Sequence, residues 1–363
     1  MTRRDYILLT PGPTPLPPSV YQKLSQPIMH HRTREFSAVF TRMIEGLKYV
    51  YRTKNDVLAA ASSGTGVMEA AVANILSPGD KVLVHSTGVF GDRFAAIARA
   101  YGLETVLLAE EWGRAADPDR LRGALRENTD VRAVFHQHTD TSTGVVNDLK
   151  TLAAIVREHS DALTVVDAIS GLGGEELETD AWELDVVVSA SQKALMCPPG
   201  LAFVAVSQKA WRAADAAELP RFYFDWRMAR QAAVQNQTPF TPAVTLIPAQ
   251  EDALRLIREE GIENVWKRTA ELAAWTRSEI RGLGLELFAK NPAAILTPII
   301  LPADVDGRKL VKDILAEDRI SIAGGQLQLA GRIVRIAHMG YIKRSDIEAG
   351  IEALAKRLCL TKT

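Results

Sequence analysis

The chain has 363 residues, of which 47% are hydrophobic and 24% charged, and its formal net charge is −1. This composition is typical of a globular protein with ample apolar material for a core, and the length suggests about two domains. A nearly neutral charge gives no basic field for nucleic acid or an anionic membrane, and no apolar run reaches the roughly 18 residues of a membrane span. We therefore expect a cytoplasmic protein with neither nucleic-acid nor membrane partners.

Through the first two thirds of the chain, short apolar segments alternate with amphipathic ones. The apolar segments are rich in β-branched residues and are typical of buried strands, at 56–62, 81–86, 132–138, 163–168, 185–190 and 202–207. The amphipathic segments between them predict helices at 66–76, 91–102 and 148–160. This alternation predicts an α/β fold with a mostly parallel sheet covered by helices on both faces.

The pattern changes after about residue 245. Residues 248–284 are nearly all helical in pattern, and they are followed by an apolar stretch, a helix, a strand and a final helix, at 294–302, 307–318, 332–338 and 344–358. This order predicts a smaller α+β domain that a long helix joins to the first.

Cysteine and histidine are too scattered for a disulfide framework or a metal centre. Only Cys197 and Cys359 occur, with no CxxC pair, and the seven histidines include no HxxxH pair. The sequence therefore predicts no metal site. We interpret Cys197 as a small buried hydrophobe.

A Ser/Gly/Thr loop separates the first predicted strand from its helix, in SSGTGVMEAA (62–71). Gly64 and Gly66 allow a ligand to approach the backbone closely. Ser63 and Thr65 supply hydroxyls, and the helix start supplies free N–H groups and the positive end of its dipole. The loop suits a phosphate, although an ordinary helix start has the same composition. It is neither a Walker loop nor a complete GxGxxG pattern, so it does not indicate a nucleoside triphosphate or NAD.

Two ionisable residues follow later strands. Asp167 ends the strand in VVDAISGLGG (165–174), and Lys193 lies one strand further on, in SASQKALMCPPG (189–200). A buried carboxylate needs a cation or several donors, and a buried lysine becomes a nucleophilic amine. Each residue alone has a simpler interpretation, Asp167 as the cap of a turn and Lys193 as an amine that reaches water along its aliphatic stem.

Together, these three features are the parts of a pyridoxal phosphate site. The loop would anchor the phosphate, Asp167 would keep the pyridine nitrogen protonated, and Lys193 would bind the aldehyde as a Schiff base. Ligands of open α/β sheets bind beyond the carboxyl ends of the strands, and all three features fall there.

The sequence resembles the class V aminotransferases of fold type I, in the alanine–glyoxylate and serine–glyoxylate aminotransferase branch. The resemblance covers nearly the whole chain and includes, besides the stretches above, LLTPGPTPLPP (8–18), STGVFGDR (86–93), HTDTSTGV (138–145), QTPFTPA (237–243) and RIVRIAHMG (332–340). It implies a large domain with a mostly parallel seven-stranded sheet and a smaller C-terminal α+β domain.

The resemblance places domain limits and cofactor contacts on this sequence. An N-terminal segment, 1–15, would line the active site, with the large domain at 16–260 and the small domain at 261–363. The residues implied to contact the cofactor are Phe90 stacked on the pyridine ring, Ile169 on its other face, Thr141 near the phenolic oxygen and Gln192 at the phosphate or the cofactor rim.

Other implied roles concern the substrate and a second subunit. Arg335 would bind the substrate α-carboxylate with its planar fork, and Gly12 would line the substrate pocket. Thr241 would reach the phosphate of the neighbouring subunit, which implies a homodimer with shared active sites. Asp140 stands where the family often has glutamate, so the reach of that carboxylate is open.

The implied activity is a ping-pong transamination from a small L-amino acid, serine or alanine, to a 2-oxo acid, glyoxylate or pyruvate. An acidic donor such as aspartate or phosphoserine stays open, because Arg32, Arg34 or His338 are candidates for a second cation. A cysteine desulfurase is disfavoured because neither cysteine is placed as a sulfur acceptor. A non-catalytic accessory protein is disfavoured because the residues that correspond to the cofactor lysine, its aspartate and the carboxylate-binding arginine are all present.

Overall fold

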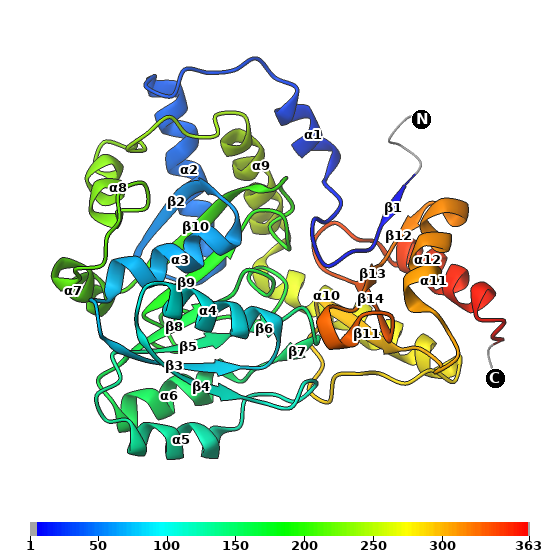
Figure 1. The fold of residues 1–363 in the computed structure, drawn as a ribbon. Helices are drawn as coiled ribbons and strands as arrows, with labels where there is room; N and C mark the ends of the chain where they lie inside the picture. The colour runs from blue at the N-terminus through cyan, green and yellow to red at the C-terminus, as the bar shows by residue number, and fades with distance from the viewer. Residues whose placement is uncertain (1–5, 362–363) are drawn as a thin grey trace.

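A seven-stranded sheet forms the centre of the larger part of the molecule. The computed structural model describes residues 6–361, and the strand order is β2-β10-β9-β8-β5-β3-β4 (Figure 1). In chain order these strands are β2 (Asp56–Ser62), β3 (Lys81–Ser86), β4 (Glu104–Ala109), β5 (Ala133–Gln137), β8 (Leu163–Asp167), β9 (Val186–Ala190) and β10 (Gly200–Val206). β10 is antiparallel to β2 and β9, and every other pair is parallel. The mostly parallel seven-stranded sheet is therefore confirmed.

Six of the strands overlap the predicted apolar segments, and β4 has no counterpart among them. β4 forms the sheet edge beyond β3, and none of its residues is fully buried. Its short apolar run lies between the charged residues Glu104 and Glu110. An edge strand meets solvent, so its sequence carries less of the continuous apolar signal of the inner strands.

Helices cover both faces of the large sheet because successive strand residues point to opposite sides. Val187 packs in an apolar cluster with α2 (Arg34–Tyr51) and α9 (Leu246–Glu260). Val186 and Val188 pack in a second cluster, with α3 (Gly64–Ile75), α4 (Val89–Ala100) and α7 (Gln208–Ala216). α5 (Pro118–Glu127) and α6 (Leu149–His159) share a smaller cluster. The two-sided cover confirms the predicted α/β class.

The helix α2 illustrates how the sequence builds these layers. Its buried face carries Phe36, Phe40, Met43 and Leu47 at helical spacing. The side chain of Thr33 caps its start by accepting the N–H of Phe36 at 3.2 Å. Burying one such large apolar side chain contributes roughly 1.5–3 kcal/mol, so the buried stripe holds this helix on the sheet.

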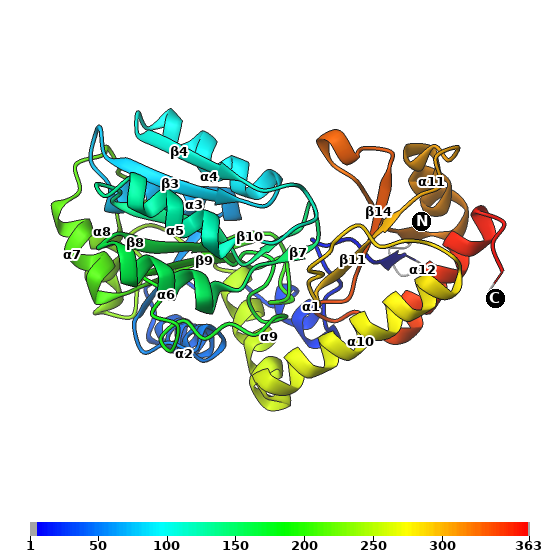
Figure 2. The ribbon, with the colours of Figure 1, turned by 90° about the horizontal axis from the view of Figure 1, so that it is seen from below.

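A three-stranded antiparallel sheet forms the centre of the smaller part, in the order β11-β14-β13. Its strands are β11 (Leu296–Ile300), β13 (Ala323–Gly324) and β14 (Ile333–Ala337). α10 (Ile262–Gly282) follows α9 and runs beneath this sheet, and α11 (Gly307–Asp313) and α12 (Arg344–Arg357) share its apolar core (Figure 2). The helix predicted over 307–318 is α11 followed by a π-helical turn, Ile314–Asp318.

The N-terminal segment joins the two parts. β1 (Ile7–Leu8) pairs with β12 (Ile320–Ser321), and Leu9 is buried in the core of the small sheet.

The remaining short elements are α1 (Pro18–Leu24), β6 (Thr139–Asp140), β7 (Val145–Val146), α8 (Trp226–Ala233) and a 3-10 turn at Leu327–Leu329. The domain limits at residues 15 and 260 stay a prediction. Within residues 6–361, no helix combines the length and apolar character needed to cross a membrane.

Candidate active site

Asp167 and Lys193 come from neighbouring parallel strands. Asp167 is the last residue of β8, where it pairs with Val188, and Lys193 follows the end of β9. Because parallel strands end at the same edge of a sheet, both side chains fall at its carboxyl edge. Asp167 is only 4% exposed, so the environment of the two residues decides their protonation.

Burial moves the pKa values of these two groups toward each other. It raises the pKa of Asp167 to about 7, and the nearby charge of Asp140 adds to this, while an N–H of Ile169 at 2.8 Å, Lys193 and Arg93 oppose it. Burial lowers the pKa of Lys193 to about 8, and the charge of Arg335 lowers it further, against the pull of Asp167. Lys193 is therefore partly neutral near physiological pH, as a nucleophilic amine requires.

The N-terminal segment covers Lys193. Its ammonium nitrogen Nζ donates to the carbonyl of Pro11. The hydroxyl of Thr14 donates to the carbonyl of Lys193 at 2.8 Å, and the Thr14 N–H donates to the carbonyl of Gln192 at 3.2 Å. A Cβ added to Gly12 would lie 2.5 Å from both Cδ and Nζ of Lys193, so a side chain at this position would displace the lysine. The structure thus places Gly12 against the lysine.

The start of α3 forms the predicted Ser/Gly/Thr cradle. Ser63 precedes the helix, and its side chain makes no capping hydrogen bond, so the first N–H groups of the helix are free of that partner. A Cβ on Gly64 would lie 2.6 Å from Cδ1 of Ile169, and a Cβ on Gly66 would lie 2.0 Å from Oγ of Ser62. The cradle therefore reaches the residues that follow Asp167, and it offers the donors that suit a phosphate.

Asp140 holds the start of α4. It is fully buried, and it accepts the N–H of Phe90 at 3.0 Å, of Gly91 at 3.4 Å and of Ser142 at 3.0 Å. Burial raises the pKa of this carboxyl, and the hydrogen bonds oppose the shift. A carboxylate at a helix N-terminus is stabilised by the helix dipole. The carboxylate of Asp140 thus reaches the backbone of Phe90 and positions that residue.

Arg335 connects the small sheet to the large one. It lies in β14, is 5% exposed, and donates from Nη1 to the carbonyl of Thr141 at 2.6 Å and from Nε and Nη2 to the carbonyl of Gly324 at 3.0 and 2.7 Å. Burial lowers its pKa to about 10, so the guanidinium keeps its charge at neutral pH. A guanidinium has five donors, so Arg335 keeps N–H groups for a carboxylate. Thr141 itself is buried, and its hydroxyl accepts from Ser170 at 3.5 Å.

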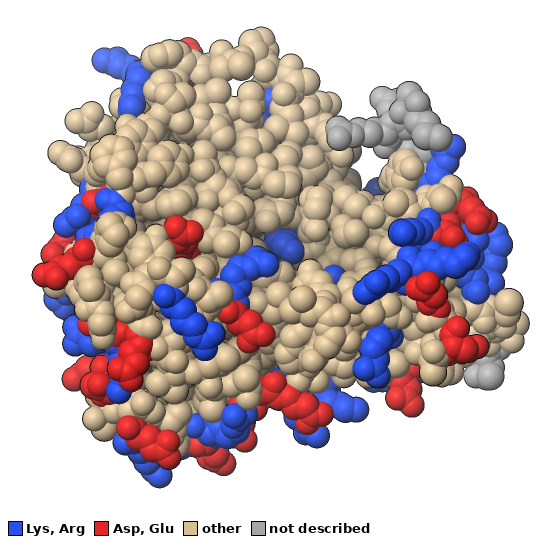
Figure 3. Space-filling view, viewed as in Figure 1, with Lys and Arg blue, Asp and Glu red and all other residues tan. Residues whose placement is uncertain are grey.

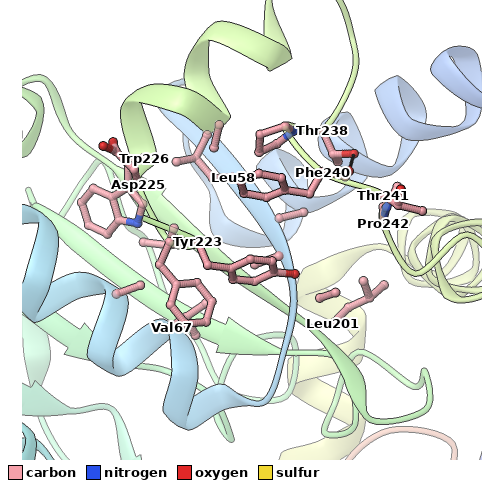
Figure 4. Close-up of a pocket in the computed structure, with 18 of the residues that line it drawn as sticks. Leu58, Val67, Leu201, Tyr223, Asp225, Trp226, Thr238, Phe240, Thr241 and Pro242 are labelled. Carbon is pink, nitrogen blue, oxygen red and sulfur yellow. Dashed lines mark hydrogen bonds between the residues drawn. The ribbon is translucent and has the colours of Figure 1, made fainter. Parts of the chain in front are cut away.

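Gln192 and Thr241 lie in different surroundings. The side-chain oxygen Oε1 of Gln192 is buried next to Lys193 without a hydrogen-bond partner, which is a fit for a ligand donor. Thr241 lies in the exposed loop before α9, beside Pro242 and Phe240 at the edge of an apolar pocket (Figure 4). The single chain therefore gathers the predicted site residues near Lys193 with the exception of Thr241.

His338 and Cys197 are both buried in the structure. His338 is a candidate second cation from the sequence, but its side chain is fully buried. Its ring nitrogens lie 2.9 Å from the Ala294 carbonyl and 3.1 Å from the Thr297 hydroxyl. Burial lowers its pKa to about 3. It is neutral at physiological pH, so this candidate is wrong. Cys197 is buried with its thiol pKa raised by burial, in keeping with a small hydrophobe.

Arg32 and Arg34 are surface residues in this chain. Arg32 donates to the Gln237 side chain at 2.6 Å and to the carbonyl of Thr238 at 2.9 Å, which joins it to the loop that carries Thr241. Arg34 is exposed at the first turn of α2. Neither contacts the buried residues around Lys193.

Arg93 is a site residue that the sequence reasoning missed. Its guanidinium carbon lies 4.8 Å from the centre of the Phe90 ring, and Nη1 donates to the Thr65 hydroxyl at 3.0 Å. The available signal was its position one helical turn after Phe90 in STGVFGDR. In the space-filling view, Lys or Arg side chains lie in the hollow between the two parts of the molecule (Figure 3).

Among the described residues, no group of three His, Cys, Asp or Glu side chains is arranged to hold a metal ion.

Comparisons with known proteins identify the family of this chain. Residues 7–349 match the family described as aminotransferase class-V. A protein of Synechococcus sp. named as the small subunit of a soluble hydrogenase is 41% identical over 351 residues, which are 96% of this chain and 91% of that protein. A serine–glyoxylate aminotransferase of Methylorubrum extorquens is 34% identical over 356 residues, which are 95% of this chain and 89% of that protein.

A solved structure gives the same result for the fold. The crystal structure of an alanine–glyoxylate aminotransferase from Nostoc sp. superposes with a TM-score of 0.94 at 30% identity, over 98% of this chain and 95% of that one. The chain belongs to the class V aminotransferases, which confirms the predicted family and fold type I. This family depends on pyridoxal phosphate and acts on amino acids and 2-oxo acids.

Proposed function

We propose that this protein is a cytoplasmic pyridoxal phosphate-dependent transaminase that moves the amino group of serine or alanine to glyoxylate or pyruvate by a ping-pong mechanism. The observation that carries the proposal is the half-buried, partly neutral Lys193 at the same sheet edge as the buried Asp167, with the cationic Arg335 close enough to lower the pKa of the lysine. The activities named for the Methylorubrum and Nostoc relatives support a small donor and glyoxylate.

The residues present fit the cofactor. Gly64 and the N–H groups at the start of α3, which lack a side-chain cap, suit its phosphate, and Oε1 of Gln192, the residue before Lys193 in the chain, is buried without a partner. Phe90 and Ile169 would cover the two faces of the ring. When bound, the cofactor supplies an aldehyde that takes up the amino group and a ring that draws electrons away from the substrate Cα.

Each ionisable residue then has a defined task. With the cofactor bound, Lys193 would hold its aldehyde carbon and would supply the amine that moves the proton of the substrate Cα, a role for which a pKa of about 8 is suitable near neutral pH. Asp167 would keep a proton on the ring nitrogen of the cofactor, and a cation placed beside this carboxyl favours its ionised form. Arg335 binds the substrate α-carboxylate with the N–H groups that Thr141 and Gly324 leave free.

A homodimer with shared active sites is part of this proposal. The face in Figure 3 that covers α1, α2 and the loop before α9 carries few charged side chains. Large apolar side chains in the neighbouring segments are exposed, at Ile28, Phe222, Tyr223 and Val234. Such a face fits a second copy of the chain, which would bring Thr241 to the partner's phosphate. Sedimentation should give twice the mass of one chain, and Phe222→Asp with Val234→Asp should give the monomer.

A set of absorption spectra tests the function. Purified protein loaded with pyridoxal phosphate should show the visible band of a cofactor joined to lysine, and Lys193→Ala should lack it. L-serine, L-alanine, L-aspartate and L-phosphoserine are then added one at a time. Bleaching by serine or alanine supports the proposal, whereas bleaching only by an acidic donor selects the second candidate, in which Arg32 or Arg34 supplies the extra cation. A protein that stays colourless with added cofactor would be a non-catalytic relative on this fold.

A further inference from the structure

Arg93 is a partly buried cation without an acidic partner. Its side chain donates to the hydroxyl of Thr65, and its guanidinium lies over the Phe90 ring. Within residues 6–361, no carboxylate forms an ion pair with it, although its neighbour Asp92 accepts from Ser86. A guanidinium has five donors and a permanent charge, so this arrangement leaves Arg93 ready for an anion.

The position of Arg93 indicates which anion it meets. Thr65 belongs to the first turn of α3, where the N–H groups lack a side-chain cap. The other residues assigned to this cradle, Ser63, Gly64, Gly66 and Gln192, carry no charge. A phosphate dianion held by neutral donors alone would lack a counter-charge, and a guanidinium supplies one through charge-assisted hydrogen bonds.

The electrostatics agree with this location. The charge of Arg93 lowers the pKa of both Asp167 and Lys193, so the guanidinium lies near both residues. Arg335, the other cation near Lys193, is engaged with Thr141 and Gly324 on the small-sheet side. The two arginines therefore lie at different ends of the site. Arg335 lies at the end assigned to the substrate carboxylate, and Arg93 lies at the start of α3.

We propose that Arg93 binds the phosphate group of the cofactor and supplies the positive charge of the cradle. This inference rests on the proposed function. It assigns Arg93 as a cofactor-binding residue that discriminates the phosphorylated cofactor from its dephosphorylated form. Two other assignments are separable by experiment, a contact with the distal carboxylate of an acidic donor and a purely structural bond between α4 and α3 through Thr65.

The test compares pyridoxal phosphate with pyridoxal, which lacks the phosphate. Cofactor-free wild-type protein, Arg93→Gln and Arg93→Lys are titrated with each ligand, and Kd is read from the absorption change. Arg93→Gln should raise the Kd for pyridoxal phosphate by about 10- to 100-fold, the range for lost hydrogen bonds to a charged group. It should raise the Kd for pyridoxal by less than about 2-fold. Arg93→Lys should lie between. Arg99→Gln, an exposed change on the same helix, should alter neither Kd.

Inorganic phosphate gives a second readout that is independent of transamination. It should strengthen pyridoxal binding to the wild type by filling the empty phosphate position, and this effect should be lost in Arg93→Gln. Because both ligands use the same fold, a variant that folds poorly weakens both together and leaves their ratio unchanged.

Every other outcome overturns the inference. An unchanged ratio of the two Kd values in Arg93→Gln shows that Arg93 does not meet the phosphate. If the ratio is unchanged while the half-reaction with aspartate alone slows, Arg93 serves a distal carboxylate. If both ligands weaken equally and the melting temperature falls, its role is structural. If the wild-type protein binds neither ligand, the proposed function itself is refuted. If the wild type prefers pyridoxal phosphate and Arg93→Gln keeps the same preference, only the role of Arg93 is refuted.

Discussion

Asp167 and Lys193 influence each other's pKa but are not joined by an ion pair. The lysine amine donates to the carbonyl of Pro11, and one Asp167 oxygen accepts the N–H of Ile169 at 2.8 Å. The two ionisable groups thus share one sheet edge but keep separate hydrogen-bond partners. This separation is what a ligand with a cationic end at the aspartate and an electrophilic end at the lysine requires.

Replacement of Lys193 should abolish transamination. Lys193→Ala removes the amine that we propose holds the cofactor and moves the proton, so the rate of the first half-reaction should fall by at least about 10²–10⁴-fold. The measurement is a single-turnover reaction with alanine, followed by stopped-flow absorption. Lys150→Ala, an exposed change on α6, serves as the control and should keep the wild-type rate. A rate for Lys193→Ala within tenfold of the wild type would contradict the assignment.

The stability of the cofactor-free protein should depend on Asp167 in a defined pH window. Its pKa rises from 3.8 to about 7 on folding, so between these values the folded protein holds a proton that the unfolded chain has released. The contribution of this group to the free energy of unfolding therefore falls as the pH rises from about 4 to 7. Urea unfolding at pH 5 and pH 8 should show a smaller loss of stability in Asp167→Asn than in the wild type.

The comparison between Asp167→Asn and the wild type cancels the titration of all other groups. Equal pH dependence in the two proteins would show that the burial of Asp167 does not shift its pKa as described. The same variant should slow transamination, because a neutral amide does not keep a proton on the ring nitrogen. Gain of stability with loss of activity is the expected combination.

A methyl group at position 12 should displace the lysine. The added Cβ of Gly12→Ala would lie 2.5 Å from Nζ of Lys193, and the φ of +123° is unfavourable for alanine. We expect a loss of about 1–3 kcal/mol in stability and a fall of about 10- to 100-fold in kcat. Gly79→Ala is the matched control, because Gly79 also has a positive φ, +82°, but nothing lies within 4 Å of its added Cβ. It should lose some stability and keep its kcat; equal kcat in both variants would contradict the steric argument.

The role of Arg335 is tested with a substrate that lacks the carboxylate. Arg335→Gln removes the charge that we propose binds the α-carboxylate, so kcat/KM for L-alanine should fall by about 10- to 100-fold. L-alaninamide has no carboxylate, so its kcat/KM should change much less. Because Arg335 also donates hydrogen bonds to Thr141 and Gly324, a purely structural effect of the substitution would lower kcat/KM for both substrates together. Equal losses would therefore rule out a direct contact with the carboxylate.

Much of the fold was accessible from the sequence because burial follows local periodicity. The inner strands are continuous apolar runs, and Asp167 and Lys193 are conspicuous because they interrupt such runs at strand ends. The edge strand β4 escaped because its residues are only partly buried. The cradle at the start of α3 was readable from its glycines and hydroxyls, since a strand–loop–helix order is itself local.

Contacts between distant segments were decided only by the tertiary structure. The bond from Arg335 to the carbonyl of Thr141 joins residues 194 positions apart, and the fit of Gly12 against Lys193 depends on β1 pairing with β12. The neutral state of His338 follows from complete burial in a junction that no sequence pattern announces. Sequence periodicity records whether a side chain is buried. Which groups face it, and hence its charge and its chemistry, depends on how whole elements pack together.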